Sequence, residues 1–174
     1  MAVVLVPDPD ALLLIRRAER EGDHWSGHLA LPGGRWSPGD EDLIATARRE
    51  SREEIGVDLG RSEPAGALDD LVPRSPVLPP ILVRPYVFAL ERRSPLVPNA
   101  EVAGAWWISL EQLLDPATLR PYEYSRYGTT VRSLGYHLDV GVLWGMTERI
   151  VTPMLRLLTE PVTALNPATR QAIP

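Results

Sequence analysis

The stretch LPGGRWSPGDEDLIATARRESREEIGV, residues 31 to 57, decides the fold, because it joins a glycine-rich loop to a strongly patterned helix. Asp40 is the expected N-cap of this helix, with Glu41 and Asp42 in its first turn, and Gly56 is its expected end. Small and apolar side chains then gather on one side of a helical wheel, the side we expect to face the core: Ile44, Ala47, Ser51 and Ile55. The pattern predicts a helix over residues 41–55.

Three glutamates, Glu50, Glu53 and Glu54, gather on another side of the same helix. Like charges four residues apart destabilise an isolated helix by a few tenths of a kcal/mol. One explanation is a solvated face neutralised by neighbouring arginines. The adjoining Gly33 and Gly34 favour another, because consecutive glycines let the backbone approach an ion or a phosphate closely. Since Mg²⁺ and Mn²⁺ prefer carboxylates and substrate phosphates, the sequence predicts a divalent-metal site for phosphate chemistry.

The composition narrows the chemistry further. A length of 174 residues favours one domain. The chain has no cysteine, and all 18 basic residues are arginine, so thiolate catalysis, a P-loop lysine and Schiff-base chemistry are excluded. No Gly-x-Ser-x-Gly elbow occurs, so no covalent nucleophile is indicated. A net charge of −5 argues against non-specific nucleic-acid binding.

No segment has the pattern of a membrane span or a secretory signal. The long helical candidate near 142–158 carries Glu148 and Arg149, and the opening MAVVLV is too short for a signal-peptide core. We therefore expect a soluble, cytoplasmic protein with no membrane partner.

The remaining chain predicts strands and helices around the patterned helix. We expect a strand pair from AVVLV and ALLLI joined by PDPD, and a short strand at HLAL. Further expected elements are strands near 65–71, 81–90 and 105–108, a short helix at 109–114, a hairpin within 121–140 and a long helix at 142–159. The proline-rich segment 72–80 should be irregular. We expect one domain, residues 1–160, followed by a polar, frayed tail, residues 161–174. The mixture of strands and helices predicts an α/β fold in which helices cover a sheet.

The patterned stretch closely resembles the Nudix box: a glycine, five residues, an acid, about seven more, then Arg-Glu-x-x-Glu-Glu-x-Gly and an aliphatic residue. Gly34, Asp40 and the run from Arg49 to Val57 match it. Asp40 stands where glutamate is usual, eight residues rather than seven separate it from Arg49, and Ser51 replaces an aliphatic residue. The resemblance implies the Nudix fold, an α/β/α sandwich with a mixed β-sheet and the box helix.

The resemblance also implies a site and a reaction. The implied metal ligands, for Mg²⁺ or Mn²⁺, are the Gly33 carbonyl and four carboxylates: Glu50, Glu53, Glu54 and Glu101. Glu101 is chosen because it lies in a loop ahead of a Trp-containing strand, six residues before Trp107; the alternative is an ordinary loop acid. Arg49 would hold the glutamates by charge-assisted hydrogen bonds. Glu53, Glu54 and Glu101 would serve catalysis, in which water attacks one phosphorus of a P–O–P bridge.

The upstream segment LLLIRRAEREGDHWSGHLALPGG resembles the coenzyme A pyrophosphatase branch of that family. Three other stretches are also similar to it: LDDLVP at 68–73, VRPYVF at 83–88 and LWGMT at 143–147. The matching upstream residues are Leu13, Leu14, Arg17, Ala18, Gly27, Ala30, Pro32, Gly33 and Gly34. This resemblance implies cleavage of coenzyme A or an acyl-CoA to 3′,5′-ADP and 4′-phosphopantetheine or its acyl form. His28 replaces the branch's glutamine, Leu31 its phenylalanine, and only Arg20 lies near its signature arginine.

Several alternatives stay open at this point. The substrate could instead be ADP-ribose, NADH, another dinucleotide or a nucleoside triphosphate. The protein could also be a Nudix ligand sensor that does not hydrolyse its ligand, but the three retained glutamates disfavour this alternative. The oligomeric state is also undecided by the sequence, and a homodimer is possible. Candidate substrate-binding residues are Arg17, Arg20, Arg35 and Arg84, each of which could be an ordinary surface ion pair. His24 and His28 are candidate bases, and Trp25, Trp36, Tyr86, Trp106 and Trp107 could stack an adenine or belong to the core.

Overall fold

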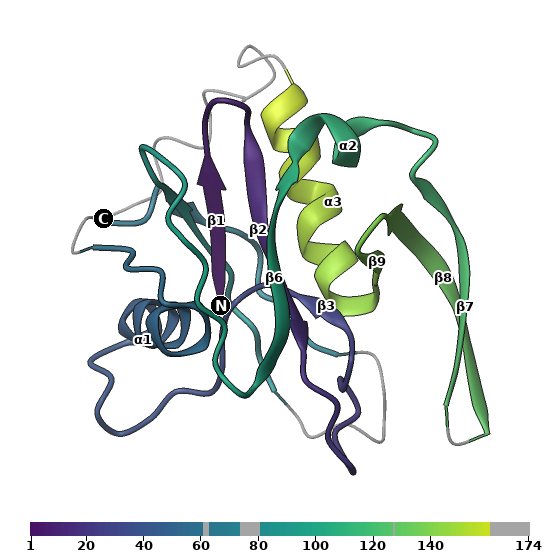
Figure 1. The fold of residues 1–174 in the computed structure, drawn as a ribbon, viewed down its shortest axis with the longest axis horizontal. Helices are drawn as coiled ribbons and strands as arrows, with labels where there is room; N and C mark the ends of the chain where they lie inside the picture. The colour runs from purple at the N-terminus through teal and green to yellow at the C-terminus, as the bar shows by residue number, and fades with distance from the viewer. Residues whose placement is uncertain (61–62, 74–80, 127, 161–174) are drawn as a thin grey trace, which may run out of the picture.

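A mixed sheet occupies the centre of the computed structural model, which describes residues 1–60, 63–73, 81–126 and 128–160 (Figure 1). Its order is β3-β2-β1-β5-β4, and β6 pairs with β2 outside this path. β1 is antiparallel to β2 and parallel to β5, and the predicted pairing of AVVLV with ALLLI is confirmed. The strands are β1 (Ala2–Val6), β2 (Ala11–Arg17), β3 (Leu29–Ala30), β4 (Gly66–Ala67), β5 (Tyr86–Ala89) and β6 (Val102–Ser109).

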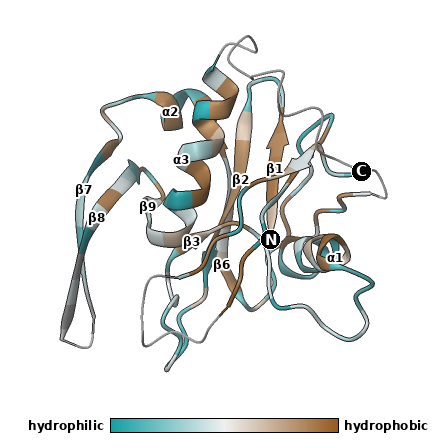
Figure 2. Ribbon diagram, turned by 180° about the vertical axis from the view of Figure 1, so that it is seen from behind, coloured by the Kyte–Doolittle hydropathy of each residue, from teal (hydrophilic) through white to brown (hydrophobic). Residues whose placement is uncertain are grey.

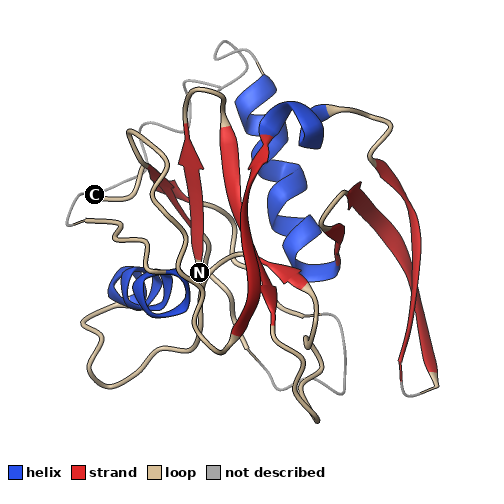
Figure 3. Cartoon of the chain, viewed as in Figure 1, coloured by secondary structure: helices blue, strands red, loops and turns tan. Residues whose placement is uncertain are grey.

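Two helices cover opposite faces of this sheet, α1 (Leu43–Ile55) on one and α3 (Gly145–Thr159) on the other (Figure 3). A short helix, α2 (Leu110–Leu114), follows β6. A second, three-stranded sheet stands beyond α3 and is formed by β7 (Leu119–Arg126), β8 (Thr129–Leu138) and β9 (Gly141–Trp144). The predicted hairpin within 121–140 is therefore confirmed as β7–β8.

Alternation along β1 and β2 explains the layers. In β2, Leu12 and Leu14 belong to the apolar cluster shared with α3, whereas Leu13 and Ile15 belong to the cluster shared with Ala47 of α1. A strand buried on both faces reads as a continuous apolar run, and β1 is largely brown in Figure 2. Burying each such side chain contributes about 1.5–3 kcal/mol. The α/β/α arrangement expected from the sequence is thus present.

The start of α1 differs from the prediction. Asp42 is the N-cap, because its carboxylate accepts the Ala45 N–H at 2.7 Å, and the helix begins at Leu43. Asp40 therefore lies outside the helix, and Glu41 and Asp42 precede the first turn. The predicted end is confirmed, since Gly56 adopts a left-handed conformation with φ 71°.

Other boundaries also shift. The long helix begins at Gly145, not at 142, because residues 141–144 pair with β8 as strand β9. The strand expected at 65–71 is reduced to Gly66–Ala67 and a single bridge between Leu71 and Val83, and the strand expected at 81–90 covers only Tyr86–Ala89. The predictions for 161–174 and for most of 72–80 fall outside the described residues. In the described part of the chain, no helix is long and apolar enough to cross a membrane.

Candidate active site

Helix α1 turns the glutamates toward the glycine loop. Glu54 is buried, with 3% of its surface exposed, and its Oε2 accepts the backbone N–H of Gly33 at 2.9 Å. Glu50 packs against Gly34 so closely that a Cβ at that position would collide with its carboxylate. Gly33 has φ 150°, and a Cβ there would meet Met1 at 2.7 Å. Gly33 is therefore needed where the loop passes Met1, and Gly34 leaves room for the Glu50 carboxylate.

Arg49 ties this helix to the preceding loop. Its Nε and Nη2 donate to the two carboxylate oxygens of Asp40, at 2.9 and 3.0 Å. Its Nη1 contacts Glu50 Oε1 at 2.8 Å and Glu53 Oε2 at 2.9 Å. Hydrogen bonds from Arg49 hold the pKa of Asp40 well below its usual range, and Asp40 in turn raises the pKa of the guanidinium. Asp40 thus anchors Arg49 to the loop that precedes α1. The N-cap prediction missed this role, although the spacing of the Nudix box marks the position of Asp40.

Glu54 has a different electrostatic environment. Burial raises the pKa of Glu54 to about 7, the Gly33 N–H opposes this shift, and the charge of Glu50 adds to it. Charges on Arg17 and Glu101 also act on this carboxylate, the arginine lowering its pKa and the glutamate raising it. A cation placed beside Glu54 would relieve the cost of its negative charge.

The carboxylates are not gathered around a common point. Among the residues that the structure describes, no three His, Cys, Asp or Glu side chains are grouped so that they could hold a metal ion. The reason is that Arg49 engages both Glu50 and Glu53, whereas Glu54 faces Gly33. The donor set nevertheless fits a hard divalent ion, because it supplies carboxylate oxygens from one helix face beside a glycine backbone. Glu53 contacts Arg49 through its Oε2 atom, and its side chain is 56% exposed.

Glu101 and two of the candidate arginines lie at the end of β2. Glu101 Oε1 pairs with Arg20 Nη2 at 3.0 Å, and its backbone carbonyl accepts the N–H of Ala18. Arg17 pairs with Asp23 at 2.9 Å. The fold therefore brings Arg17 and Glu101 into the electrostatic surroundings of Glu54, with Arg20 attached to Glu101.

The other two arginines are engaged differently. Arg84 forms a two-pronged ion pair with Asp70, at 2.7 and 2.6 Å. Arg35 is exposed, and its backbone carbonyl accepts Arg49 Nη2 at 3.2 Å. For Arg84 the structure thus shows the surface ion pair that was the alternative reading. His24 is exposed in the loop that follows β2.

A ring-lined pocket of about 410 Å³ lies between the β7–β8 hairpin, β9 and the residues just before β3. Its aromatic lining consists of His28, Tyr122, Tyr124 and Trp144. Of these residues only His28 was singled out from the sequence, and none of the five aromatic residues predicted to stack an adenine lines this pocket. The alternation of Tyr122 and Tyr124 along one strand was the available signal, since i and i+2 share a face.

Comparison with known proteins relates this chain to Nudix proteins. The NUDIX domain family matches residues 1–127. An uncharacterized protein of Schizosaccharomyces pombe is 41% identical over 145 residues, covering 76% of this chain but only 44% of its own length, so the chain spans less than half of that relative. The uncharacterized Nudix hydrolase NudL of Yersinia pestis is 31% identical over 150 residues, covering 86% of this chain and 72% of its own.

Solved structures agree on the fold. A MutT/nudix family protein from Enterococcus faecalis superposes with a TM-score of 0.55 at 18% identity, covering 86% of this chain and 57% of that one. The NUDIX domain of Shewanella oneidensis NrtR, solved with ADP ribose, gives 0.52 at 22% identity, covering 65% of this chain and 72% of that one. At these identities the likeness concerns the fold alone. Together with the family match over most of the chain, these findings show that the chain belongs to the Nudix family.

Proposed function

We propose that this protein is a divalent-metal-dependent pyrophosphohydrolase that cleaves the P–O–P bond of a nucleoside diphosphate derivative. The observation that carries the proposal is the buried Glu54 carboxylate, which faces the Gly33 N–H with Glu50 and Glu53 on the same helix. A buried carboxylate that forms no ion pair among the described residues is costly in a purely structural role. Family membership supports the same chemistry.

The proposed roles follow from the contacts. Glu50, Glu53, Glu54 and the Gly33 carbonyl would hold Mg²⁺ or Mn²⁺, which when bound polarises a phosphoryl group and lowers the pKa of water. Arg49 holds Glu50 and Glu53 in place through its anchor on Asp40. Glu101 accepts the proton of the attacking water. The water oxygen forms the new P–O bond as the bridging P–O bond breaks, and the other phosphate leaves with that electron pair.

The proposed substrate is coenzyme A or an acyl-CoA, with ADP-ribose, NADH, other dinucleotides and nucleoside triphosphates as alternatives. Support comes from the stretches outside the box that resemble the coenzyme A pyrophosphatase branch. Two of these stretches bind each other: Asp70 pairs with Arg84, and Leu71 bridges Val83. Residues 68–73 and 83–88 therefore have a structural reason to be present. The assignment of coenzyme A as substrate rests more on residues 12–34 and 143–147.

Substrate profiling with Mg²⁺ tests this proposal. The protein should convert CoA to 3′,5′-ADP and 4′-phosphopantetheine, and it should prefer CoA to 3′-dephospho-CoA if an arginine clamps the 3′-phosphate. Much faster cleavage of ADP-ribose or NADH would overturn the CoA assignment but would still support a pyrophosphohydrolase. Binding without cleavage of any member would favour a ligand sensor.

Glu101→Gln tests the assignment of the base. The change should lower kcat by about 10²–10⁴-fold, as expected for loss of a general base, with the fold intact because the Arg20 pair is exposed. Glu91→Gln, an exposed loop acid, is the matched control and should retain wild-type rates. Wild-type turnover in Glu101→Gln would show that the base lies elsewhere.

A further inference from the structure

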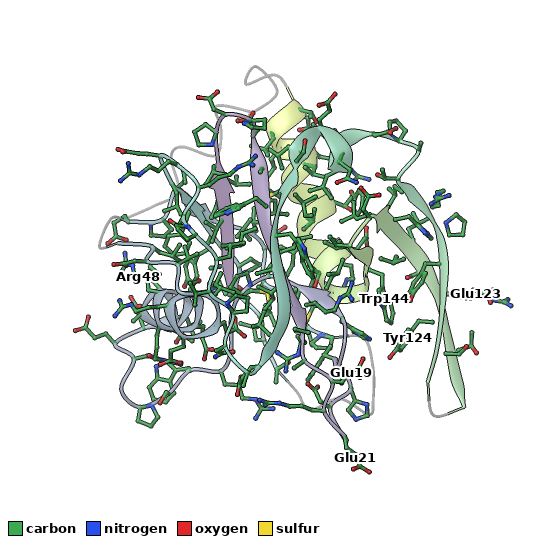
Figure 4. The ribbon with its side chains drawn as sticks, viewed as in Figure 1. Glu19, Glu21, Arg48, Glu123, Tyr124 and Trp144 are labelled. Carbon is green, nitrogen blue, oxygen red and sulfur yellow. The ribbon has the colours of Figure 1, made fainter. Side chains whose placement is uncertain are left out.

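The ring-lined pocket is built differently from the apolar core. Tyr124 and Trp144 lie with ring centroids 4.7 Å apart and planes inclined by 37°, and His28 stands at 4.9 Å from each of them. All four rings are only half-buried, whereas the core rings Tyr136 and Phe88 are each 3% exposed. Figure 4 shows Tyr124 and Trp144 on the inner side of the β7–β8 hairpin. The ring cluster therefore presents aromatic surface to an open space of about 410 Å³.

The carboxylate of an exposed residue, Glu19, also lines the pocket. Its Oε2 accepts the Ser26 hydroxyl at 2.9 Å. Its Oε1 lies where a Cβ on Gly27 would collide with it, and Gly27 has φ 75°, so the glycine leaves room for the carboxylate. Within the part of the chain that the structure describes, Glu19 has no ion-pair partner. A held carboxylate beside stacked rings offers a hydrogen-bond acceptor to a flat ligand that carries a donor at its edge.

The pocket adjoins the acidic site along the chain. His28 lies five residues before Gly33, and β3 between them pairs with the end of β2. At that end Arg16 lines the pocket, whereas its neighbour Arg17 acts electrostatically on Glu54. The end of β2 thus links the ring-lined pocket to the surroundings of Glu54.

We propose that this pocket binds the adenine-type base of the nucleotide substrate. The base stacks on Tyr124 and Trp144, and Glu19 accepts a hydrogen bond from its exocyclic amino group. Stacking tolerates any flat base, so the carboxylate supplies the discrimination. The identity of the base rests on the proposed function, because CoA, ADP-ribose and NADH all carry adenine, but base binding itself needs neither metal nor hydrolysis.

The test is calorimetric binding of AMP and purine riboside 5′-monophosphate in EDTA, because these ligands have no P–O–P bond and differ only in the amino group. The wild-type protein should bind AMP at least tenfold more tightly than purine riboside 5′-monophosphate. Tyr124→Ala should weaken AMP binding roughly 5- to 150-fold, the range for loss of one base–aromatic stack, whereas Tyr124→Phe should bind like wild type. Glu19→Ala should bring the two affinities within about twofold of each other, since the discriminating acceptor is gone.

Matched controls are available in the same elements. Glu123 follows Tyr122 in β7 but points to the outside, where it pairs with Arg132, and Glu21 is exposed at the tip of the loop that carries Glu19 (Figure 4). Glu123→Ala and Glu21→Ala should leave both affinities unchanged. Equal affinity of the wild type for AMP and purine riboside 5′-monophosphate, or wild-type AMP binding by Tyr124→Ala, would overturn the proposal. Tight AMP binding by a protein that hydrolyses nothing would support the pocket while refuting the proposed function.

Discussion

Asp40 shows how one residue can be located from sequence and yet misassigned. Its place ahead of a helix predicted an N-cap, but in the structure it is buried and receives both prongs of Arg49, the Ser37 N–H and the Thr46 hydroxyl. Two aspartates compete for the cap position, and Asp42 is the one spaced to reach the Ala45 N–H. Local helix rules could not decide between them, because the deciding partner, Arg49, lies nine residues further along.

Asp40→Asn should lower the thermal unfolding midpoint at pH 7, because Arg49 loses the buried one of its charged partners. The pKa of Asp40 is depressed in the folded protein, so its stabilising contribution is present above the ordinary Asp pKa and is lost as pH falls. The difference from wild type should therefore shrink below about pH 4. Differential scanning calorimetry checks this, with Glu123→Gln, an exposed pair with Arg132, as the control. An unchanged midpoint at pH 7 would contradict the anchoring role.

Glu54→Gln should stabilise the metal-free protein at neutral and higher pH. Burial raises the pKa of Glu54 from 4.5 to about 7, so the folded state holds a proton that the unfolded state releases, and stability falls as pH rises through this window. The variant removes that loss, which is on the order of 3 kcal/mol above pH 7. Urea unfolding in EDTA from pH 4 to 8 measures it. Glu53→Gln, an exposed control on the same helix, should keep the wild-type slope, and a wild-type slope in Glu54→Gln would refute the claim.

At the scale of elements, the revised start of α1 can be tested directly. Asp42→Ala should destabilise the protein by about 1 kcal/mol, the usual cost of losing an N-cap side chain. The midpoint should fall by roughly 2–4 °C for a domain of this size. Glu41→Ala, one residue earlier and exposed, should change it little. Equal effects of the two variants would argue against Asp42 as the cap.

Elements with strong local patterns were predictable, and those that depend on partners were not. The continuous apolar runs of β1 and β2, the stripe of α1 and the Gly56 stop are local signals, and the structure confirms all of them. Residues 142–144 were predicted as helix because VLW has no polar alternation. They belong to strand β9 because they pair with the edge of β8. Secondary-structure propensity does not encode such a tertiary contact.

At the scale of the whole molecule, the box spacing located the glutamates, Arg49 and the glycine loop, because one helix and its preceding loop carry them all. The ring-lined pocket was not predicted, since it joins residues 28, 122, 124 and 144, which only the packing of the second sheet brings together. The candidate arginines divided similarly: Arg17 is electrostatically coupled to Glu54, whereas Arg84 pairs with Asp70. Distant pairings of this kind need the three-dimensional fold.

The most direct test of the central claim, that the box carboxylates support metal-dependent cleavage of a pyrophosphate bond, is product analysis by ³¹P NMR. Wild-type protein and Glu53→Gln would be incubated with Mg²⁺ and a panel of CoA, ADP-ribose, NADH and nucleoside triphosphates. We expect the wild type to convert at least one member, CoA foremost, into the two phosphate products of P–O–P cleavage, and EDTA or Glu53→Gln to abolish that conversion while circular dichroism shows an intact fold. Full activity in excess EDTA or in Glu53→Gln, or no cleavage of any member by the folded wild type, would contradict the claim.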